Sequence, residues 1–148
     1  MLLWPIVYRC ATVCAMRRTR PIPRTSIRIG RASAGMGLFA AKPIEPGMYL
    51  EYTGRLITTK ESDRMKQARY LFEINTRWTI DGSPRSNLAR YFNHSCTPNC
   101  ESVQSGKRIF IKAKRRIKAG DELTYDYGKE YVDEFIKPHG CKCKKCLS

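Results

Sequence analysis

Three cysteines lie within six residues near the end of the chain, in the stretch CKCKKC. Thiolates this close together can ligate one metal ion, but tetrahedral zinc needs four ligands. The fourth must come from a distant segment, and Cys96 and Cys100 in the stretch YFNHSCTPNC are the available donors. Such a site would tie the end of the chain to its middle. The alternative is a set of incidental surface thiols, which would be reactive when exposed.

The number and setting of the cysteines favour metal ligation over disulfides. The 148-residue chain has seven cysteines, an odd number, and no convincing secretory segment, which indicates a reducing compartment. Its apolar N-terminal stretch is interrupted by Pro5 and Arg9, is too short to span a membrane and lacks the basic start of a signal peptide. We therefore expect no membrane association. Met1 and Met16 both stay open as the start of translation.

The chain carries a large positive charge. It has 28 Lys and Arg against 13 Asp and Glu, a net charge of +15, and residues 1–44 contain no acidic side chain. This balance predicts attraction to polyanions such as nucleic acid. The densest basic segment is KRIFIKAKRRIK at 107–118, whose alternation also suits a strand with one solvated, charged face. The alternative for the N-terminal charge is a loose, solubilising arm.

Short segments of alternating or β-branched character follow a Pro- and Arg-rich linker, TRPIPRTS, which we expect to be extended or mobile. Each is closed by Gly, Pro, Asn or Asp, as is typical of short strands and turns. Residues 59–69 and 86–92 favour short helices. We expect one mostly β domain of several small sheets, preceded by a disordered basic arm at residues 1–25. The strand-like stretches are SIRIG, MYLEYTG, YLFEI, WTID, RIFIKAK and ELTYDY.

Two further motifs suggest a ligand site. SAGMGLF at 33–39 contains a G-x-G pair, which lets the backbone approach a ligand closely, although an ordinary turn before a strand has the same residues. GDELTYDYG at 120–128 places Tyr125 and Tyr127 two residues apart, so both hydroxyls project to one face of a strand. Tyrosine titrates near about 10, so these hydroxyls would act as hydrogen-bond partners and not as bases. The alternative is a pair of half-buried core tyrosines.

In this order, the G-x-G turn, EYTG, YLF, ARYFNHSCTPNC, GDELTYDYG and the cysteine-rich tail resemble the SET-domain family of protein-lysine methyltransferases. The resemblance covers residues 26–146, and NHSC-x-PN and ELTYDY are its most specific motifs. It implies that residues 26–130 form a SET domain, a mostly β fold with a few short helices. In this fold several small sheets surround a knot-like C-terminal crossing. It also implies a zinc-bound post-SET tail at residues 131–148, and transfer of a methyl group from S-adenosylmethionine to a lysine side chain.

The family's binding residues carry over to the matching positions of this chain. Asn93 and His94 would hold polar groups of the cofactor, with Tyr91 and Phe92 packing beneath them. Lys142, between the first two tail cysteines, would lie near the adenine. The implied cofactor positions are Ala34, Gly35, Met36, Gly37, Tyr70, Asn93, His94 and Lys142, and the implied zinc ligands are Cys96, Cys141, Cys143 and Cys146.

The implied catalytic positions are all tyrosines. Tyr127 matches the family's catalytic tyrosine, Tyr125 matches the position that influences how many methyl groups are added, and Tyr70 would line the same channel. A tyrosine at position 125 resembles enzymes that favour mono- or dimethylation. The tail departs from the family pattern, because its C-x-C-x2-C spacing is two residues shorter than the usual C-x-C-x4-C.

The resemblance also implies partners and a location. We expect a protein substrate, with a histone tail as the leading candidate, and a nuclear or chromatin location, with a cytoplasmic or exported protein as the alternative. The basic arm and residues 107–118 are expected to contact DNA or a nucleosome. Two other functions stay open: an inactive SET-type binding module, and a basic, zinc-stabilised module that binds chromatin or nucleic acid. The oligomeric state is not readable from the sequence.

Overall fold

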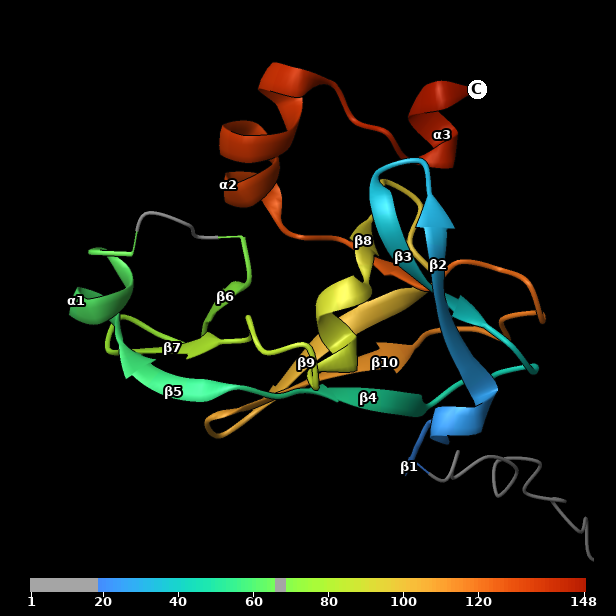
Figure 1. Cartoon of the computed structure of the whole chain (residues 1–148), viewed down its shortest axis with the longest axis horizontal. Helices are drawn as coiled ribbons and strands as arrows, with labels where there is room; N and C mark the ends of the chain where they lie inside the picture. Colours follow the sequence, from blue (N-terminus) through green and yellow to red (C-terminus); the bar gives the residue numbers. More distant parts are fainter. Residues whose placement is uncertain (1–18, 66–68) are drawn as a thin grey trace, which may run out of the picture.

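The computed structural model describes residues 19–65 and 69–148, and most of their regular structure is β (Figure 1). The strands are short and form several small sheets, as the turn residues between them predicted. They are β1 (Arg20–Pro21), β2 (Ile27–Ala32), β3 (Gly35–Ala40), β4 (Met48–Tyr52), β5 (Arg55–Thr58), β6 (Leu71–Glu73), β7 (Trp78–Asp81), β8 (Asn93–His94), β9 (Cys100–Ser105), β10 (Arg108–Ala113) and β11 (Thr124–Tyr125).

The helical segments are equally short and lie between or after the sheets. Three of them, α2, η3 and η4, follow one another directly and form a single helical segment, residues 129–139, above β8 in Figure 1. The elements are η1 (Arg24–Ser26), α1 (Thr59–Ser62), η2 (Leu88–Tyr91), α2 (Lys129–Tyr131), the π-helical η3 (Val132–Ile136), η4 (Lys137–His139) and α3 (Lys144–Leu147).

β4 and β10 form the centre of the largest sheet, whose strand order is β1-β4-β10-β9. Side chains alternate along β10, so that Ile109 and Ile111 are buried whereas Arg108 lies exposed on the other face. The basic segment around β10 is thus a strand with one charged face. On that face Arg108 donates two hydrogen bonds to Glu51 of β4, at 2.8 and 2.7 Å.

The pairing of β8 with β11 brings two segments together that lie about thirty residues apart in sequence. The strands are parallel, with Asn93 opposite Thr124 and His94 opposite Tyr125. The Ser95 N–H extends the pairing by donating to the Tyr125 carbonyl at 3.1 Å. The two motifs that were expected to cross therefore lie side by side, and they contribute Asn93, His94, Tyr125 and Tyr127 to the site described below.

One hydrophobic core joins the small sheets. Leu38, Ile44, Ile111 and Leu123 come from four separate segments and are fully buried, and Phe92 is 1% exposed beneath the site. Burial of each such side chain contributes about 1.5–3 kcal/mol. The sheets are therefore held to one another by a shared core, because a two-stranded sheet such as β2-β3 or β8-β11 is at best marginally stable by itself.

The expected boundary between a disordered arm and the domain at residue 25 was too late in the sequence. β1 pairs in parallel with β4, and η1 follows it directly. Ile22 is the physical reason, because its side chain is 4% exposed and its N–H donates to the Tyr49 carbonyl at 2.8 Å. The linker is extended only at its start, where β1 joins the sheet, and its end forms η1. The rest of the predicted arm, with Met1 and Met16, lies outside the described residues.

Other element predictions were confirmed in part. The six strand-like stretches each contain a strand, but the glycine-rich stretch that was expected to be a turn forms β3. Among the described residues of the helix predicted at 59–69, the regular helix is α1, where Thr58 accepts a capping hydrogen bond from the Glu61 N–H at 3.2 Å. Residues 66–68 lie outside the described part. No helix among the described residues is long and apolar enough to cross a membrane.

Candidate functional site

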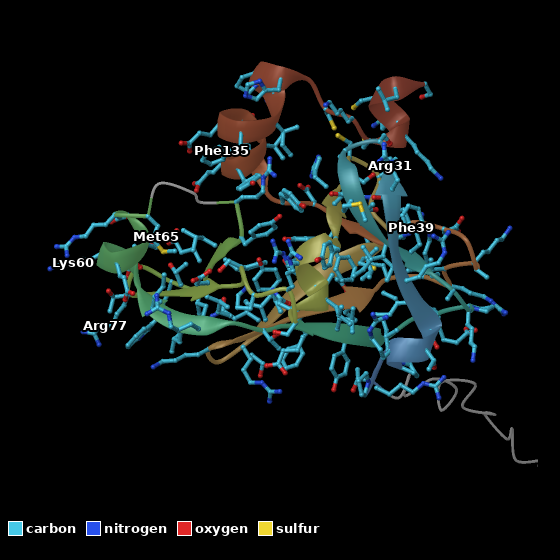
Figure 2. All side chains as sticks on the ribbon, in the orientation of Figure 1. Arg31, Phe39, Lys60, Met65, Arg77 and Phe135 are labelled. Atoms are coloured by element: carbon cyan, nitrogen blue, oxygen red, sulfur yellow. The ribbon has the colours of Figure 1, made fainter. Side chains whose placement is uncertain are left out.

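A large cleft of about 1380 Å³ collects most of the residues that the motifs singled out. Small-molecule pockets generally occupy about 300–1,000 Å³, so this cleft has room for more than one ligand. The helical segment 129–139 forms one side, and the end of α1 forms the opposite side, where Figure 2 labels Phe135 and Met65. Its walls include Ala34, Gly35, Met36, Tyr70, Asn93, His94, Tyr125, Tyr127, Lys142 and Cys143.

Tyr125 and Tyr127 both project into the cleft, as their spacing predicted. Their ring centroids are 4.9 Å apart, and burial raises the pKa of both phenols well above the usual value. The Tyr127 hydroxyl donates to the Phe92 carbonyl at 2.5 Å. Both side chains are therefore protonated hydrogen-bonding groups at neutral pH, held in an aromatic wall.

The aromatic wall extends beyond the predicted tyrosines. Phe72 stacks on Tyr125 with centroids 6.4 Å apart, and Tyr52 packs against Phe72 at 5.3 Å. On the other side Tyr131 contacts Tyr127 edge-on at 5.1 Å. Sequence reasoning missed these three side chains as site residues, although YLFEI and EYTG were recognised as strand-like. The cleft therefore has a desolvated floor, in which a charged side chain is disfavoured.

Tyr70 lines the same cleft, and an arginine packs on its ring. The Arg90 guanidinium sits 3.9 Å from the centre of the Tyr70 ring, and a hydrogen bond from Arg90 lowers the pKa of the phenol. The Tyr70 carbonyl accepts from the Tyr52 hydroxyl at 2.9 Å. Arg90 was not predicted, and its place within ARYFNHSC was its only signal.

Asn93 has its amide nitrogen fixed by two acceptors. Nδ2 donates to Glu122 Oε1 at 2.7 Å and to the Met36 carbonyl at 3.3 Å. Both acceptors are reached by the nitrogen, so the amide oxygen is the group left for a ligand in the cleft. Gly37 makes this packing possible, because a Cβ there would lie 2.7 Å from Glu122 Oε1 and 3.0 Å from Asn93 Nδ2. Glu122 was not predicted as a site residue.

The glycine-rich turn borders the same region. Gly35 has φ +119°, a conformation that side chains rarely adopt, and no atom lies within 4 Å of the position that a Cβ would take. Ala34 and Gly35 line the cleft, and Met36 is 54% exposed at its edge. The requirement for glycine at position 35 is thus conformational, whereas at position 37 it is steric.

His94 lies between the tyrosines and the cysteines. Its side chain is 6% exposed, and burial lowers the pKa of the imidazole, a shift that the nearby Asp126 carboxylate opposes. Nδ1 lies 3.2 Å from the Tyr127 backbone nitrogen, and Nε2 lies 3.6 Å from the Cys96 sulfur. The ring is therefore neutral at physiological pH and touches two other parts of the site.

Four cysteines cluster beside the cleft. Cys96, Cys141, Cys143 and Cys146 have their sulfurs within 4.8 Å of one another. The Cys96 sulfur lies 3.9 Å from that of Cys141 and 3.7 Å from that of Cys146. Tetrahedral zinc with Zn–S bonds of about 2.3 Å requires sulfurs about 3.8 Å apart, so the cluster fits a zinc ion.

The geometry places Cys96, and not Cys100, beside the three tail cysteines. Cys96 belongs to the cluster, whereas Cys100 is 1% exposed in the core and has its pKa raised to about 12 by burial. The short spacing of the tail is accommodated by α3, which begins directly after Cys143 and returns Cys146 to it within one turn, with the Cys146 N–H donating to the Cys143 carbonyl at 3.0 Å. Lys142 lines the cleft between two ligand positions.

The fold, the aromatic channel and the four-cysteine cluster together define a SET-type domain. The family model described as "SET domain" matches residues 35–128, which is more than half of the chain. The protein therefore belongs to the SET-domain family, as the motifs indicated.

Known relatives agree with this assignment. Histone-lysine N-methyltransferase trithorax of Drosophila virilis is 41% identical over 124 residues, or 76% of this chain. Histone-lysine N-methyltransferase 2D of Homo sapiens is 37% identical over 144 residues, or 88% of this chain. Histone-lysine N-methyltransferase set1 of Dictyostelium discoideum is 37% identical over 123 residues, or 74% of this chain. The matched regions are only 3%, 3% and 8% of those proteins, which are far longer.

Proposed function

We propose that this protein is an S-adenosylmethionine-dependent protein-lysine N-methyltransferase. The observation that carries the proposal is the channel in which Tyr125 and Tyr127 stand beside the Asn93–Glu122 pair and the glycine turn. The names of the relatives support the same activity, and the SET-domain match supports the same cofactor.

The cofactor would occupy the part of the cleft near the glycine turn. Bound S-adenosylmethionine supplies an activated methyl group on a sulfonium centre. The Asn93 amide oxygen is suited to accept from an ammonium group, and the exposed backbone at Ala34 and Gly35 to make close polar contacts. His94, Met36 and Lys142 border the same space, Tyr70 lines its channel side, and Gly37 lies behind it, packed against Glu122 and Asn93.

The channel residues prepare the substrate lysine for attack. An ammonium has no lone pair, and lysine has a reference pKa near about 10.4, so its proton must leave before transfer. The buried rings of Tyr125, Phe72 and Tyr52 disfavour the charged form by desolvation, and the Arg90 guanidinium near Tyr70 adds like-charge repulsion. The Tyr127 hydroxyl and backbone carbonyls then orient the neutral amine, so that alignment supplies much of the rate.

The number of methyl groups added depends on Tyr125 in this proposal. Its side chain is 9% exposed and is closed in by the Phe72, Phe92 and Tyr127 rings. A hydroxyl there takes up volume and gives water a hydrogen-bond partner, both of which oppose a bulkier, already methylated amine. Mono- or dimethylation is therefore favoured.

Zinc would be held by Cys96, Cys141, Cys143 and Cys146. The tail contains little apolar surface of its own to bury, and Leu147 is 62% exposed, so metal ligation supplies the cross-link that a small core cannot. The ion has a structural role in this proposal, because four protein ligands leave no open coordination position. Its consequence is to keep Lys142 and Cys143 at the cleft.

The protein substrate is proposed to be a histone tail, and the location to be nuclear or at chromatin, because the relatives are named for histone lysines. A positively charged enzyme repels a basic tail unless an anion joins them. DNA or nucleosome contact would come from the basic arm and residues 107–118, and β1, at the described end of the arm, belongs to the same sheet as β10. Arg108 is paired with Glu51, which leaves Lys114, Arg115 and Lys118 beyond β10 as the better phosphate contacts.

The proposal is tested by transfer of labelled methyl from S-adenosylmethionine to core histones and nucleosomes. We expect the label to appear on one histone. Tyr127→Phe should reduce the rate of transfer by at least about 100-fold, because removal of one oriented hydrogen-bond donor from an active site typically has an effect of this size. Tyr49→Phe is the matched control, because Tyr49 packs on Phe110 in the main sheet. Cofactor binding without label would indicate a different protein substrate, and loss of both binding and transfer would favour a non-catalytic binding module.

A further inference from the structure

The imidazole of His94 has two partners that cofactor binding does not explain. The side chain is 6% exposed, so its ring nitrogens must find hydrogen-bond partners within the protein. Nδ1 lies 3.2 Å from the backbone nitrogen of Tyr127, which follows β11. Nε2 lies 3.6 Å from the Cys96 sulfur, within reach of an N–H···S hydrogen bond. One ring thus spans the distance between the cysteine cluster and the channel.

The partners determine which nitrogen carries the proton. A backbone N–H can only donate, so Nδ1 must accept from Tyr127 and be unprotonated. The proton of the neutral ring is then on Nε2, which donates to the Cys96 sulfur. Asp126 Oδ1 lies 3.6 Å from Nδ1, which is beyond hydrogen-bond distance, and it accepts from the Gly128 N–H at 2.9 Å. All of these hydrogen bonds are therefore consistent with one tautomer.

Tyr127 is consequently held at both ends by the segment that carries His94. Its N–H donates to the imidazole, and its hydroxyl donates to the Phe92 carbonyl. The two rings also meet edge-on, with centroids 5.6 Å apart. Displacement of the His94 ring would break the hydrogen bond from the Tyr127 N–H, which adds to the pairing of β8 with β11 in holding this segment.

We propose that His94 is a positioning residue that connects the four-cysteine cluster to Tyr127, so that occupancy of the metal site and the orientation of the tyrosine depend on each other. The imidazole orients the Cys96 thiolate from one side and the Tyr127 backbone from the other. Outer hydrogen bonds of this kind hold ligands in position for a metal ion, and their loss typically lowers metal affinity by about 10–100-fold. The inference rests on the zinc site proposed above.

Two substitutions separate the two ends of this connection. His94→Asn places an oxygen near the position of Nδ1 and keeps the acceptor for Tyr127, but does not reach Cys96. His94→Gln places an NH₂ group near the position of Nε2 and keeps the donor to the sulfur. Zinc affinity, measured by competition with a chromophoric chelator, is expected to fall by about 10–100-fold in His94→Asn and to stay within a few-fold of wild type in His94→Gln.

The response of Tyr127 supplies a second readout that is independent of activity. In protein labelled with ¹⁵N-tyrosine, the Tyr127 amide is assigned by its disappearance in Tyr127→Phe. Removal of zinc should shift this signal in wild type and shift it less in both His94→Asn and His94→Gln, because each variant lacks one end of the connection. An equal shift in all three proteins would overturn the connection through His94.

The tautomer can be measured in unmodified protein, so the proposal stays testable even where a variant fails to fold. The chain has two histidines, and ¹⁵N-histidine ring signals are separated by comparison with His139→Gln. A neutral His94 protonated on Nε2 is expected in zinc-loaded protein, and protonation on Nδ1 would overturn the inference. Protein that takes up no zinc would overturn the zinc site itself, whereas tight zinc binding unaffected by His94→Asn would overturn only the connection.

Discussion

Asn93 donates from its side-chain amide to the Glu122 carboxylate at 2.7 Å, across 29 residues of sequence. This hydrogen bond joins the NHSC motif to the ELTYDY motif and fixes the amide so that its oxygen is left for a ligand. A charged acceptor makes it a stronger hydrogen bond than a neutral pair would form. We therefore expect the affinity for the proposed cofactor to depend on a carboxylate that acts through the Asn93 amide.

Glu122 is predicted to govern cofactor affinity through this hydrogen bond. Glu122→Ala should weaken S-adenosylmethionine binding by at least about tenfold, because a hydrogen bond to a charged group contributes about 1.5–3 kcal/mol. Glu122→Gln keeps an oxygen that accepts from Asn93 and should weaken binding much less. Calorimetric titration with the cofactor measures both. Equal weakening in the two variants would contradict a role for the acceptor oxygen.

Tyr125→Phe is predicted to change the products and leave the protein folded. The hydroxyl is removed from a closed aromatic wall, which frees room for a bulkier amine and removes a partner for water. Di- and trimethylated peptide should increase relative to the wild-type products, as followed by mass spectrometry over time. An unchanged product distribution, with transfer still fast, would show that another residue limits methylation.

Loss of one cluster cysteine should abolish stoichiometric zinc, whereas loss of the core cysteine should not. Cys96→Ser and Cys146→Ser each remove a ligand from the set of four. Cys100→Ala is the control, since that thiol is buried in the core and its removal affects packing. Metal analysis after gel filtration distinguishes them. Full zinc content in Cys96→Ser would disprove this ligand set.

The rate of methyl transfer should increase with pH, and ionisation of the channel tyrosines should not lower it. Burial raises the pKa values of Tyr125 and Tyr127, so both phenols stay protonated above about pH 10, the ordinary value for tyrosine. The substrate ammonium loses its proton as the pH rises, so the rate should increase between about pH 7 and 9. Initial rates with a peptide, checked for intact fold by circular dichroism, measure this. A fall below about pH 10 that disappears in Tyr125→Phe would contradict the direction of these shifts.

The basic arm should matter for nucleosomes and not for short peptides. We would change four arginines of the arm to Gln together: Arg17, Arg18, Arg20 and Arg24. This variant should methylate nucleosomes more slowly. The slope of log K for nucleosome binding against log salt concentration should decrease in magnitude by about 0.9 for each phosphate that the arm no longer neutralises. Lys60 and Arg77 are exposed near α1 and β7, at the edge labelled in Figure 2, and their neutralisation is the control. Equal reductions on peptide and nucleosome would rule out an anchoring role.

Much of the fold and site could be predicted because the informative residues are local. Alternating apolar residues indicated β10, and two tyrosines at spacing two indicated one wall of the cleft. The cluster needed a fourth ligand, and the motif order selected Cys96. The short tail spacing departs from the family pattern, and one turn of α3 accommodates it.

The rest depended on packing between segments that no local pattern encodes. Glu122 looks like an ordinary polar residue beside the buried Leu123, and its meaning comes only from the packing of Gly37 and Asn93 against it. β1 was missed because a proline-rich stretch has weak strand propensity, and a single buried side chain, Ile22, fixes it to β4. Arg90 likewise becomes informative only beside Tyr70.

The separation of 50 residues between Cys96 and Cys146 has a consequence for synthesis. Domains acquire their structure as the chain leaves the ribosome, from the N-terminal side onward. All of the strands precede the three tail cysteines, so the sheets can assemble while Cys96 still lacks its distant partners. Zinc uptake would then be the last event of folding. A chain interrupted between β11 and Cys146 would have its sheets but an open metal site, which a protease or a chaperone could distinguish from the finished domain.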